Sequence, residues 1–243
     1  MRSLLRWVLL CGVAFVSLQL YFVGRIAAMA VIDPQSTAFE RSEAWRVARE
    51  RDTFRWRQEW VPYERISDNL KRAVIASEDD SFRQHDGVDW EALEKAWAKN
   101  AKAEQRAEQR LSQGKASTKP PKIVGGSTIT QQLAKNLMLS GERTLIRKAQ
   151  EWVITLALES FLSKPQILTL YLNHVEWGRG VFGAEAAARH YFQKPASQLS
   201  AWEAARLAVM LPRPRYFEKL PQSAYLSDRA QTIMARMNDV ALP

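Results

Sequence analysis

The first candidate for chemistry in this sequence is a glutamate. Glu78 falls beside Val74 and Ile75 on the apolar face of a helix that we expect over residues 66–79. A carboxylate where the pattern predicts an apolar residue is partly desolvated, which raises its pKa and suits it to proton transfer. The alternative is a helix-terminal glutamate paired with an arginine, and this segment alone leaves both interpretations open.

The second candidate is the segment 125–136, GGSTITQQLAKN, in which polar residues crowd a helical pattern. One edge of this helix is apolar and is expected to be buried, since Ile129, Leu133 and Leu137 recur at four-residue steps. Another face is uncharged except for one lysine, and its members are Thr128, Gln131, Gln132 and Lys135. Ser127 stands where an N-cap is expected. The pattern fits either a ligand-binding face or a partly buried helix with hydrogen-bonded amides.

A group of charges follows in the next expected helix. Arg147, Lys148 and Glu151 share one face of it, and Lys135 and Arg143 precede them in the chain. Four cations from two successive helices suit a diphosphate, and they would keep a glutamate among them ionised. The alternative is an ordinary exposed ion pair, worth about 0.3–0.5 kcal/mol. The core-facing stripe of this helix is expected to be Leu145, Ala149, Trp152, Val153 and Leu156.

The composition limits the classes of protein that fit. With 243 residues and 47% hydrophobic content, the chain can bury a core in one or two domains. Its net charge of +9 indicates an acidic partner, and nucleic acid, an anionic membrane surface and a phosphate-bearing substrate all satisfy that sign. The single cysteine, Cys11, excludes an intramolecular disulfide and a zinc site made of thiolates. The three dispersed histidines have no metal-ligand spacing.

The N-terminal segment, residues 1–32, predicts a single-pass transmembrane helix. Residues 7–24 carry no charge and the apolar character resumes after Arg25, which suffices to cross about 30 Å of hydrocarbon. The alternative is a cleaved signal peptide with an A-x-A site at residues 28–30. Because the apolar region of a signal peptide usually spans only ~7–15 residues, we favour a retained anchor.

The charges beside this segment bear on its orientation. Arg2 and Arg6 precede the span and predict that the N-terminus lies inside and the body outside. A basic run within residues 41–57 follows the span, and a simple count of positive charges on each side would predict the opposite orientation. Long domains, however, translocate largely regardless of charge. Residues 33–60 form a juxtamembrane segment in which arginines alternate with aromatic residues. That composition suits a membrane interface as well as an ordinary solvated helix.

The rest of the chain, residues 61–243, is expected to form one all-α domain, because strand-like alternation is nearly absent. Ser200 and Glu203 make a capping box, so Glu203 is expected to be structural. Residues 100–122 repeat AEQR and then become rich in Gly, Ser, Thr and Pro, which is linker composition. We expect a helix there that frays into a basic loop.

Five motifs occur in one order along the chain. They are EDDSFRQHDGVD at 78–89, GGSTITQQLAKN at 125–136, RKAQE at 147–151, KPQILTLYLN at 164–173 and LSAWEAARLAVMLPRPRYF at 199–217. Together they resemble the five sequence blocks of the peptidoglycan glycosyltransferases of family 51. Since residues 218–243 leave no room for a transpeptidase domain, we expect the monofunctional biosynthetic form.

The resemblance implies a fold, an activity and a location. The fold is a lysozyme-like helical glycosyltransferase domain, and the activity is that of a hexosyltransferase that polymerises lipid II into linear glycan with inversion at the anomeric carbon. The location is the inner (cytoplasmic) membrane, with the catalytic domain on the periplasmic side. The implied partners are lipid II, the growing glycan strand, the membrane and cell-wall synthesis proteins, with no nucleic acid.

The resemblance also implies roles for residues. Glu78 matches the glutamate taken as general base, and Glu151 matches a second essential glutamate. Cations near the donor diphosphate match Lys135, Arg143, Arg147 and Lys148. The remaining substrate-binding positions are Asp79, Phe82, His85, Ser127, Thr128, Gln131, Gln132 and Asn136. No protein metal site is expected, although a divalent cation, Mg or Mn, is compatible with the diphosphate.

Two other functions remain open. A lysozyme-like fold could cleave glycan, as a lytic transglycosylase does, with Glu78 as general acid. The clustered cations argue against cleavage, because it offers no diphosphate to neutralise. The chain could also be a membrane-anchored basic scaffold without catalysis, and Glu78 on an apolar face argues against that. The basic insertion at residues 100–122 looks longer than usual for the family, and it enters where the family has its mobile donor-side segment.

Overall fold

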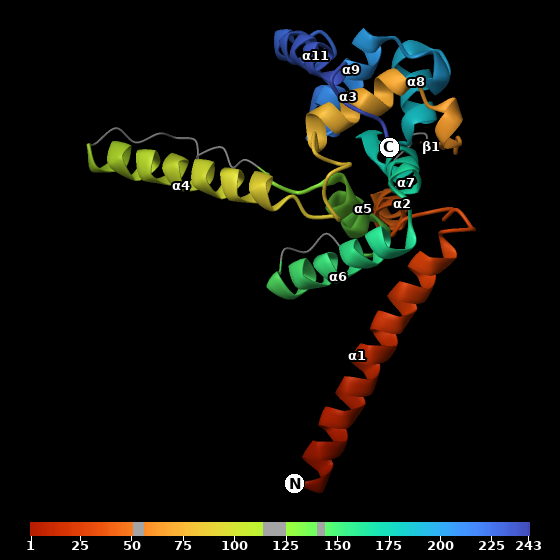
Figure 1. Ribbon diagram of the computed structural model, residues 1–243, viewed down its shortest axis with the longest axis vertical. Helices are drawn as coiled ribbons and strands as arrows, with labels where there is room; N and C mark the ends of the chain where they lie inside the picture. The colour runs from red at the N-terminus through yellow and green to blue at the C-terminus, as the bar shows by residue number, and fades with distance from the viewer. Residues whose placement is uncertain (51–55, 114–124, 140–143) are drawn as a thin grey trace.

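The computed structural model describes residues 1–50, 56–113, 125–139 and 144–243, and these are mostly helical (Figure 1). The α-helices in chain order are α1 (Arg2–Ala28), α2 (Ala38–Glu50), α3 (Asp68–Glu78), α4 (Trp90–Ser112), α5 (Ile129–Met138), α6 (Leu145–Phe161), α7 (Lys164–His174), α8 (Ala184–Phe192), α9 (Ala201–Met210), α10 (Pro214–Phe217) and α11 (Ala224–Met237). The predicted all-helical fold with an N-terminal apolar helix is confirmed.

Helix α1 is a long rod that projects from the body of the protein (Figure 1). Its 27 residues include no acidic residue, and at 1.5 Å per residue they span about 40 Å. The helix is long and apolar enough to cross a membrane. Its C-terminal end packs into the core of the body, where Ile26 and Met29 are buried. Most of the remaining surface of α1 is exposed and apolar, which suits a lipid environment.

Helices α3, α9 and α11 pack against one another in the half of the body farther from α1 (Figure 1). Helix α9 permits close packing because its buried face is rich in alanine, including Ala204, Ala205 and Ala208. The stripe predicted for the last helix is buried on α11 and includes Leu226, Ala230, Ile233 and Met237. Each large apolar side chain buried in this way contributes roughly 1.5–3 kcal/mol. The packing fixes α3, and with it Glu78 at the end of that helix.

Helices α5, α6 and α7 form the half of the body that is nearer to α1. Helix α5 packs against α2, α6 and α7, and α1 packs against α6. The apolar edge predicted for α5 is confirmed, since Ile129, Leu133 and Leu137 are buried. Through these contacts α5 is held between α6, which packs against α1, and α7.

The predicted core-facing stripe of α6 is wrong. Leu145 is 89% exposed and Leu156 is 55% exposed, whereas Glu151, Ile154 and Leu158 are buried. Helix α6 has apolar residues on two faces. The face with Ile154 and Leu158 packs inward, together with Glu151. The other face stays exposed in the half of the body that carries α1. The sequence pattern shows both faces but does not decide which one meets the core.

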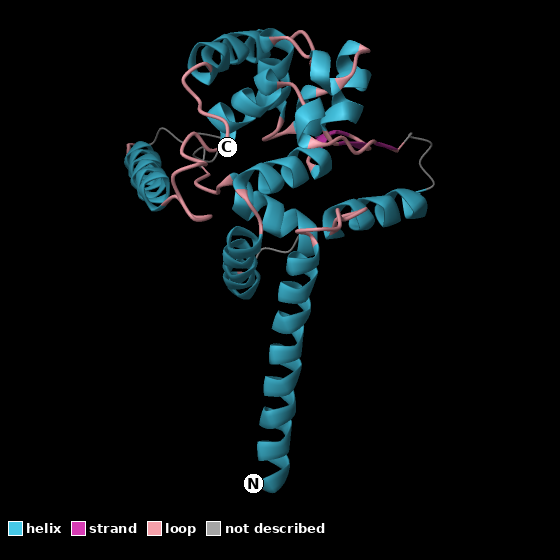
Figure 2. Cartoon of the chain, turned by 45° about the vertical axis from the view of Figure 1, so that its right-hand side comes forward, coloured by secondary structure: helices cyan, strands magenta, loops and turns pink. Residues whose placement is uncertain are grey.

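A small sheet lies beside α8, and Figure 2 shows its strands in magenta. It contains β1 (Arg57–Gln58), β2 (Glu176–Gly178) and β3 (Val181–Phe182) in the order β1-β3-β2, with β3 parallel to β1 and antiparallel to β2. Strands this short give no alternation for the sequence to reveal. The turn into α8 requires Gly183, because its φ is 84° and a Cβ there would lie 2.6 Å from the carbonyl oxygen of Asn173.

Helix α4 extends away from the body (Figure 1). Its N-cap is Asp89, whose Oδ1 accepts a hydrogen bond of 2.7 Å from the backbone N–H of Ala92. The predicted helical part of residues 100–122 is helical as far as Ser112. The basic loop predicted after it falls on residues 114–124, which lie outside the described residues.

Candidate active site

Glu78 is the last residue of α3 and is partly buried. Burial raises its pKa, hydrogen bonds from Gln132 and Ser77 lower it, and the charge of Asp79 raises it again, so the net shift is upward. A carboxylate with a raised pKa that still lines a cavity can accept a proton from a substrate hydroxyl. The sequence-based expectation of a partly desolvated glutamate agrees with this environment.

Gln132 connects Glu78 to the core of the protein. Its Nε2 donates to Glu78 Oε2 at 3.0 Å, and its Oε1 accepts from the hydroxyl of Tyr171 at 3.0 Å. Burial raises the pKa of Tyr171 well above its usual value, and the charges of Glu78 and Asp79 add to the rise, so Tyr171 stays a neutral donor. Because an ionised carboxylate can only accept, the amide NH₂ group of Gln132 must face Glu78, and the amide oxygen is left to accept from the phenol.

Asp79 joins the end of α3 to the start of α5. Its Oδ2 accepts from the backbone N–H of Ile129 at 3.0 Å, and its Oδ1 lies 2.8 Å from His85 Nε2. The backbone N–H of Gly87 donates to His85 Nδ1 at 3.1 Å, so Nε2 carries the proton that is shared with Asp79. We assign Asp79 and His85 to positioning the two helices that carry Glu78 and Gln132.

Helix α5 begins one residue later than the sequence pattern predicted. Its N-cap is Thr128, and the expectation that Ser127 caps it is wrong. Thr128 Oγ1 accepts from the N–H of Gln131 at 3.2 Å, and Gln131 Oε1 accepts from the N–H of Thr128 at 3.1 Å. The Thr128 hydroxyl also donates to the carbonyl of Gly87 at 2.6 Å. That partner lies far away in the chain, so a local pattern contains no sign of it.

Glu151 holds two cations at the inner face of α6. Its Oε2 accepts from Arg147 Nη1 at 2.9 Å, and its Oε1 accepts from Lys148 Nζ. The Glu151 side chain is 4% exposed and the Lys148 side chain is 41% exposed, so the carboxylate is enclosed while the ammonium group reaches solvent. This arrangement fixes where the two positive charges lie, unlike an ordinary ion pair on a helix surface.

Two cavities meet at Ser127. The first, which we call the cation cavity, has a volume of about 470 Å³ and is lined by Gln131, Gln132, Lys135, Asn136, Arg147, Lys148 and Glu151, among others. The second, which we call the glutamate cavity, has a volume of about 300 Å³, and Glu78 and Lys99 line it. Gln132 lines the first cavity and is hydrogen-bonded to Glu78 in the second. A group bound among the cations therefore lies close to the candidate base.

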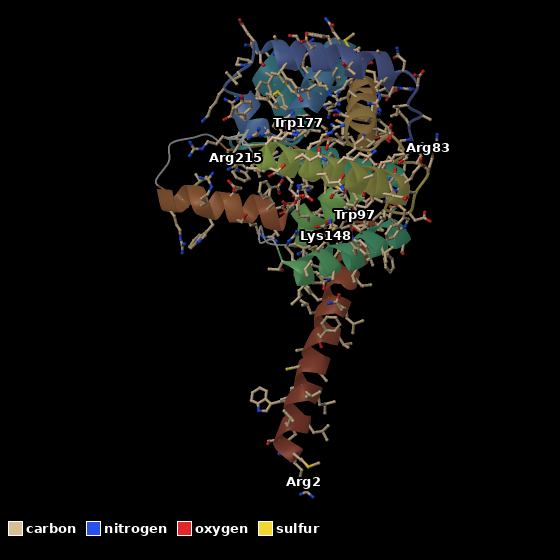
Figure 3. All side chains as sticks on the ribbon, turned by 90° about the vertical axis from the view of Figure 1, so that its left-hand side faces the viewer. Arg2, Arg83, Trp97, Lys148, Trp177 and Arg215 are labelled. Carbon is tan, nitrogen blue, oxygen red and sulfur yellow. The ribbon has the colours of Figure 1, made fainter. Side chains whose placement is uncertain are left out.

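The rim of the cation cavity contains an ion-pair network that the sequence did not predict. Arg215 Nε donates to Glu176 Oε1 at 2.7 Å, and Arg215 Nη2 lies 2.6 Å from Glu43 Oε2. Burial raises the pKa of Glu176, and the hydrogen bond from Arg215 opposes the rise without cancelling it. The network joins α2 to β2. Figure 3 shows Arg215 and Lys148 on the body above the anchor. Arg215 lies in the fifth sequence block, which is the only sequence signal for it.

Three of the predicted site residues differ in their placement. Phe82 is fully buried, and Lys164 Nζ lies 4.6 Å from its ring centre, so we assign Phe82 to packing rather than to substrate contact. Arg143 lies outside the described residues. Lys135 is exposed on α5 and lines the cation cavity, as a cation near a diphosphate would.

Comparison with known proteins agrees with this geometry. A family model described as Transglycosylase matches residues 46–238. The chain belongs to the transglycosylase family. A Burkholderia thailandensis protein named biosynthetic peptidoglycan transglycosylase is 50% identical, over 100% of this chain and 90% of that protein. Relatives of the same name from Burkholderia orbicola and Burkholderia multivorans are 49% and 47% identical, over 99% and 98% of this chain and 94% and 92% of their own lengths.

The transglycosylase match includes Glu78, Glu151 and every cation of the cation cavity, and it is consistent with a lysozyme-like helical domain. A divalent ion held by the protein would need carboxylate oxygens that are not already paired with Arg or Lys side chains. Both oxygens of Glu151 contact cations, and Glu176 is paired with Arg215. In the ranges that the structure describes, no three His, Cys, Asp or Glu side chains gather as a metal-binding group. The described carboxylates of the cation cavity therefore do not fit a protein-held metal.

Proposed function

We propose that this protein is a peptidoglycan glycosyltransferase that polymerises lipid II into linear glycan strands and releases undecaprenyl diphosphate. The observation that carries the proposal is the junction of the two cavities. One contains a carboxylate with a raised pKa, and the other contains positive charges fixed around Glu151. A weak hydroxyl nucleophile needs a base, and a diphosphate leaving group needs charge neutralisation.

In this reaction Glu78 removes the proton from the 4-hydroxyl of the acceptor sugar. The hydroxyl oxygen forms a bond to the anomeric carbon of the donor while the bond from that carbon to the diphosphate oxygen breaks. The proton ends on Glu78 and the electron pair of the broken bond leaves with the diphosphate. Direct attack from the face opposite the leaving group inverts the anomeric carbon.

The cation cavity is where we place the donor diphosphate. Lys135, Arg147 and Lys148 line it, and cations held in place before the reaction stabilise charge as it develops on the leaving group. We assign Glu151 to positioning Arg147 and Lys148, because each of its oxygens already accepts from one of them. Gln132 then links the donor side to the acceptor side through its hydrogen bond to Glu78.

We further propose that α1 lies in the inner membrane with the domain on the periplasmic side. Two arginines near its start, Arg2 and Arg6, support an N-terminus inside the cell. Exposed apolar residues on α6 and α4, including Ile146, Trp152 and Trp97, suit a domain that rests on the lipid surface from which lipid II is taken. The growing glycan strand and cell-wall synthesis proteins are the partners that this placement favours, and nucleic acid is not among them.

The proposal is tested by incubating the purified full-length chain with lipid II in detergent and separating the products. We expect polymeric glycan that requires Glu78 and carries inverted linkages. Incubation with preformed glycan tests the cleaving alternative in parallel. Fragments from glycan without polymer from lipid II would establish cleavage, and neither product would favour the non-catalytic scaffold.

A further inference from the structure

A third cavity, of about 630 Å³, adjoins the glutamate cavity. It lies between the end of α3, the turn that follows it and the end of α11, and we call it the C-terminal cavity. Ala76, Asp80 and Arg236 line both it and the glutamate cavity. Arg236 Nη2 donates to Asp80 Oδ2 at 2.9 Å, so this ion pair stands at the boundary between the two. A molecule that places a hydroxyl at Glu78 can therefore extend into the C-terminal cavity.

One wall of the C-terminal cavity is made by the residues after α11, and it is anchored to the core. The guanidinium of Arg72 on α3 donates to the carbonyl of Val240, and the Val240 side chain is buried. The hydroxyl of Tyr63 donates to the carbonyl of Pro243 at 3.4 Å. These contacts hold the backbone that carries Asp239, which lines the cavity.

The lining of the C-terminal cavity carries charges of both signs. Arg83 and Asp239 are exposed and line this cavity but not the glutamate cavity. Within the described ranges, neither side chain has a hydrogen bond or ion pair to the protein. Ser81 and Gln84 add a hydroxyl and an amide, and no aromatic ring occurs among the described lining residues on which a sugar could stack. Such a lining suits a polar peptide with carboxylate and amine or amide groups better than it suits a neutral sugar.

We propose that the C-terminal cavity binds the short peptide carried by the acceptor, while the acceptor hydroxyl lies at Glu78. The inference rests on the proposed function, because an acceptor in peptidoglycan synthesis carries such a peptide on its sugar. Arg83 pairs with a peptide carboxylate, and Asp239 accepts from a peptide amine or amide. Arg83 lies on the part of the body away from the anchor (Figure 3), where an acceptor peptide points into water rather than into lipid.

The test uses the full-length protein and two acceptors, lipid II with its peptide intact and lipid II from which the peptide has been removed enzymatically. Initial rates of transfer from a labelled glycan donor that carries the diphosphate are measured against acceptor concentration for wild type, Arg83→Ala and Asp239→Asn. Arg229→Ala is the matched control, because Arg229 is exposed on α11 and does not line the cavity. We expect Arg83→Ala to raise KM for the peptide-bearing acceptor roughly three- to tenfold with kcat unchanged, the effect of one charge-assisted contact in a partly exposed site. KM for the stripped acceptor and the melting temperature should stay as in wild type.

The peptide site would be overturned if a variant changed KM equally for the two acceptors. It would also be overturned if neither Arg83→Ala nor Asp239→Asn changed KM for either acceptor. Competition by inorganic phosphate that depends on Arg83 and is the same with both acceptors would make the cavity a simple anion site, and that also overturns it. Failure of the proposed function looks different, because wild-type protein would then extend neither acceptor.

Discussion

Gln132 and Glu78 are joined by a hydrogen bond of 3.0 Å, and the amide oxygen on the other side of Gln132 accepts from the hydroxyl of Tyr171 at 3.0 Å. The amide donates to the carboxylate and so stabilises its ionised form against the effect of burial. Two opposing effects therefore set the pKa of Glu78. Burial raises it, and the hydrogen bond from Gln132 on α5 lowers it.

Gln132→Leu removes the donor and leaves burial unopposed on that side of Glu78. The pKa of Glu78 should then rise further, and the acidic limb of the pH dependence of kcat/KM should move to higher pH. Activity should fall most below the new pKa and recover partly in alkaline buffer, since a base acts only when ionised. Tyr171→Phe leaves the amide in place and should produce a smaller shift in the same direction. A limb that moves to lower pH in Gln132→Leu would contradict the assignment.

Lys135→Ala tests where the donor diphosphate lies. A cation that lines the cavity acts on charge that develops on the leaving group in the transition state, so the loss of Lys135 should lower kcat/KM by about 10²-fold or more. Lys102→Ala is the matched control, because Lys102 is an exposed lysine on α4 whose charge is screened by solvent. Steady-state kinetics with lipid II measure both. Similar losses in the two variants would remove the reason for placing the diphosphate beside Lys135.

The anchor and α6 are joined by a reciprocal amide pair. Gln19 Nε2 donates to Gln150 Oε1 at 2.9 Å, and Gln150 Nε2 donates back to Gln19 Oε1 at 2.9 Å. Either single change to leucine leaves an amide unpaired near lipid, so Gln19→Leu with Gln150→Leu should destabilise the protein less than the sum of the single variants. The expected coupling is about 0.6 kcal/mol. Melting temperatures in detergent measure it, with Ser17→Leu as the control on α1. Strict additivity of the two changes would show that the pair is not coupled.

The corrected start of α5 gives a test of stability. Thr128→Ala removes the N-cap and the hydrogen bond to the Gly87 carbonyl, so it should cost about 1–2 kcal/mol and lower the melting temperature. Ser127→Ala is the matched control, because Ser127 lines the cavities without capping the helix. Thermal unfolding followed by circular dichroism compares them. A larger loss of stability in Ser127→Ala would return the N-cap to the position that the sequence pattern predicted.

Much of the fold followed from local patterns. The apolar edge of α5, the stripe of α11 and the long apolar α1 each repeat within a few turns of helix, so periodicity predicts them. The capping box of Ser200 and Glu203 is likewise local, and it is present in the structure. Glu78 could be singled out because a carboxylate interrupted an apolar stripe.

The parts that the sequence did not predict depend on distant contacts. Helix α6 carries two apolar faces, and its packing against α5, α1 and α7 decides that Ile154 turns inward and Leu156 outward. The two hydrogen bonds that connect Tyr171, Gln132 and Glu78 join α7, α5 and α3. No single periodic segment of the sequence reveals them. Arg215 and Glu176 meet for the same reason, across an interval of the chain that contains the α-helices α8 and α9.

We propose Glu78 as the catalytic base. Glu78→Gln keeps the shape and the hydrogen-bonding capacity of the side chain but removes the carboxylate. It should therefore retain the melting temperature and the affinity for lipid II while kcat falls ~10²- to 10⁴-fold. Glu203→Gln is the control. Burial opposes ionisation of Glu203, but hydrogen bonds from Lys194 and Ser200 outweigh it and lower its pKa, so this change should affect stability rather than kcat.

The most direct measurement is the single-turnover rate of glycan formation from lipid II by Glu78→Gln beside Glu203→Gln, with melting temperatures recorded on the same preparations. We expect a folded Glu78→Gln protein that binds lipid II and forms almost no glycan, and a Glu203→Gln protein with a nearly wild-type rate. A Glu78→Gln protein that forms glycan within a few-fold of the wild-type rate would contradict it.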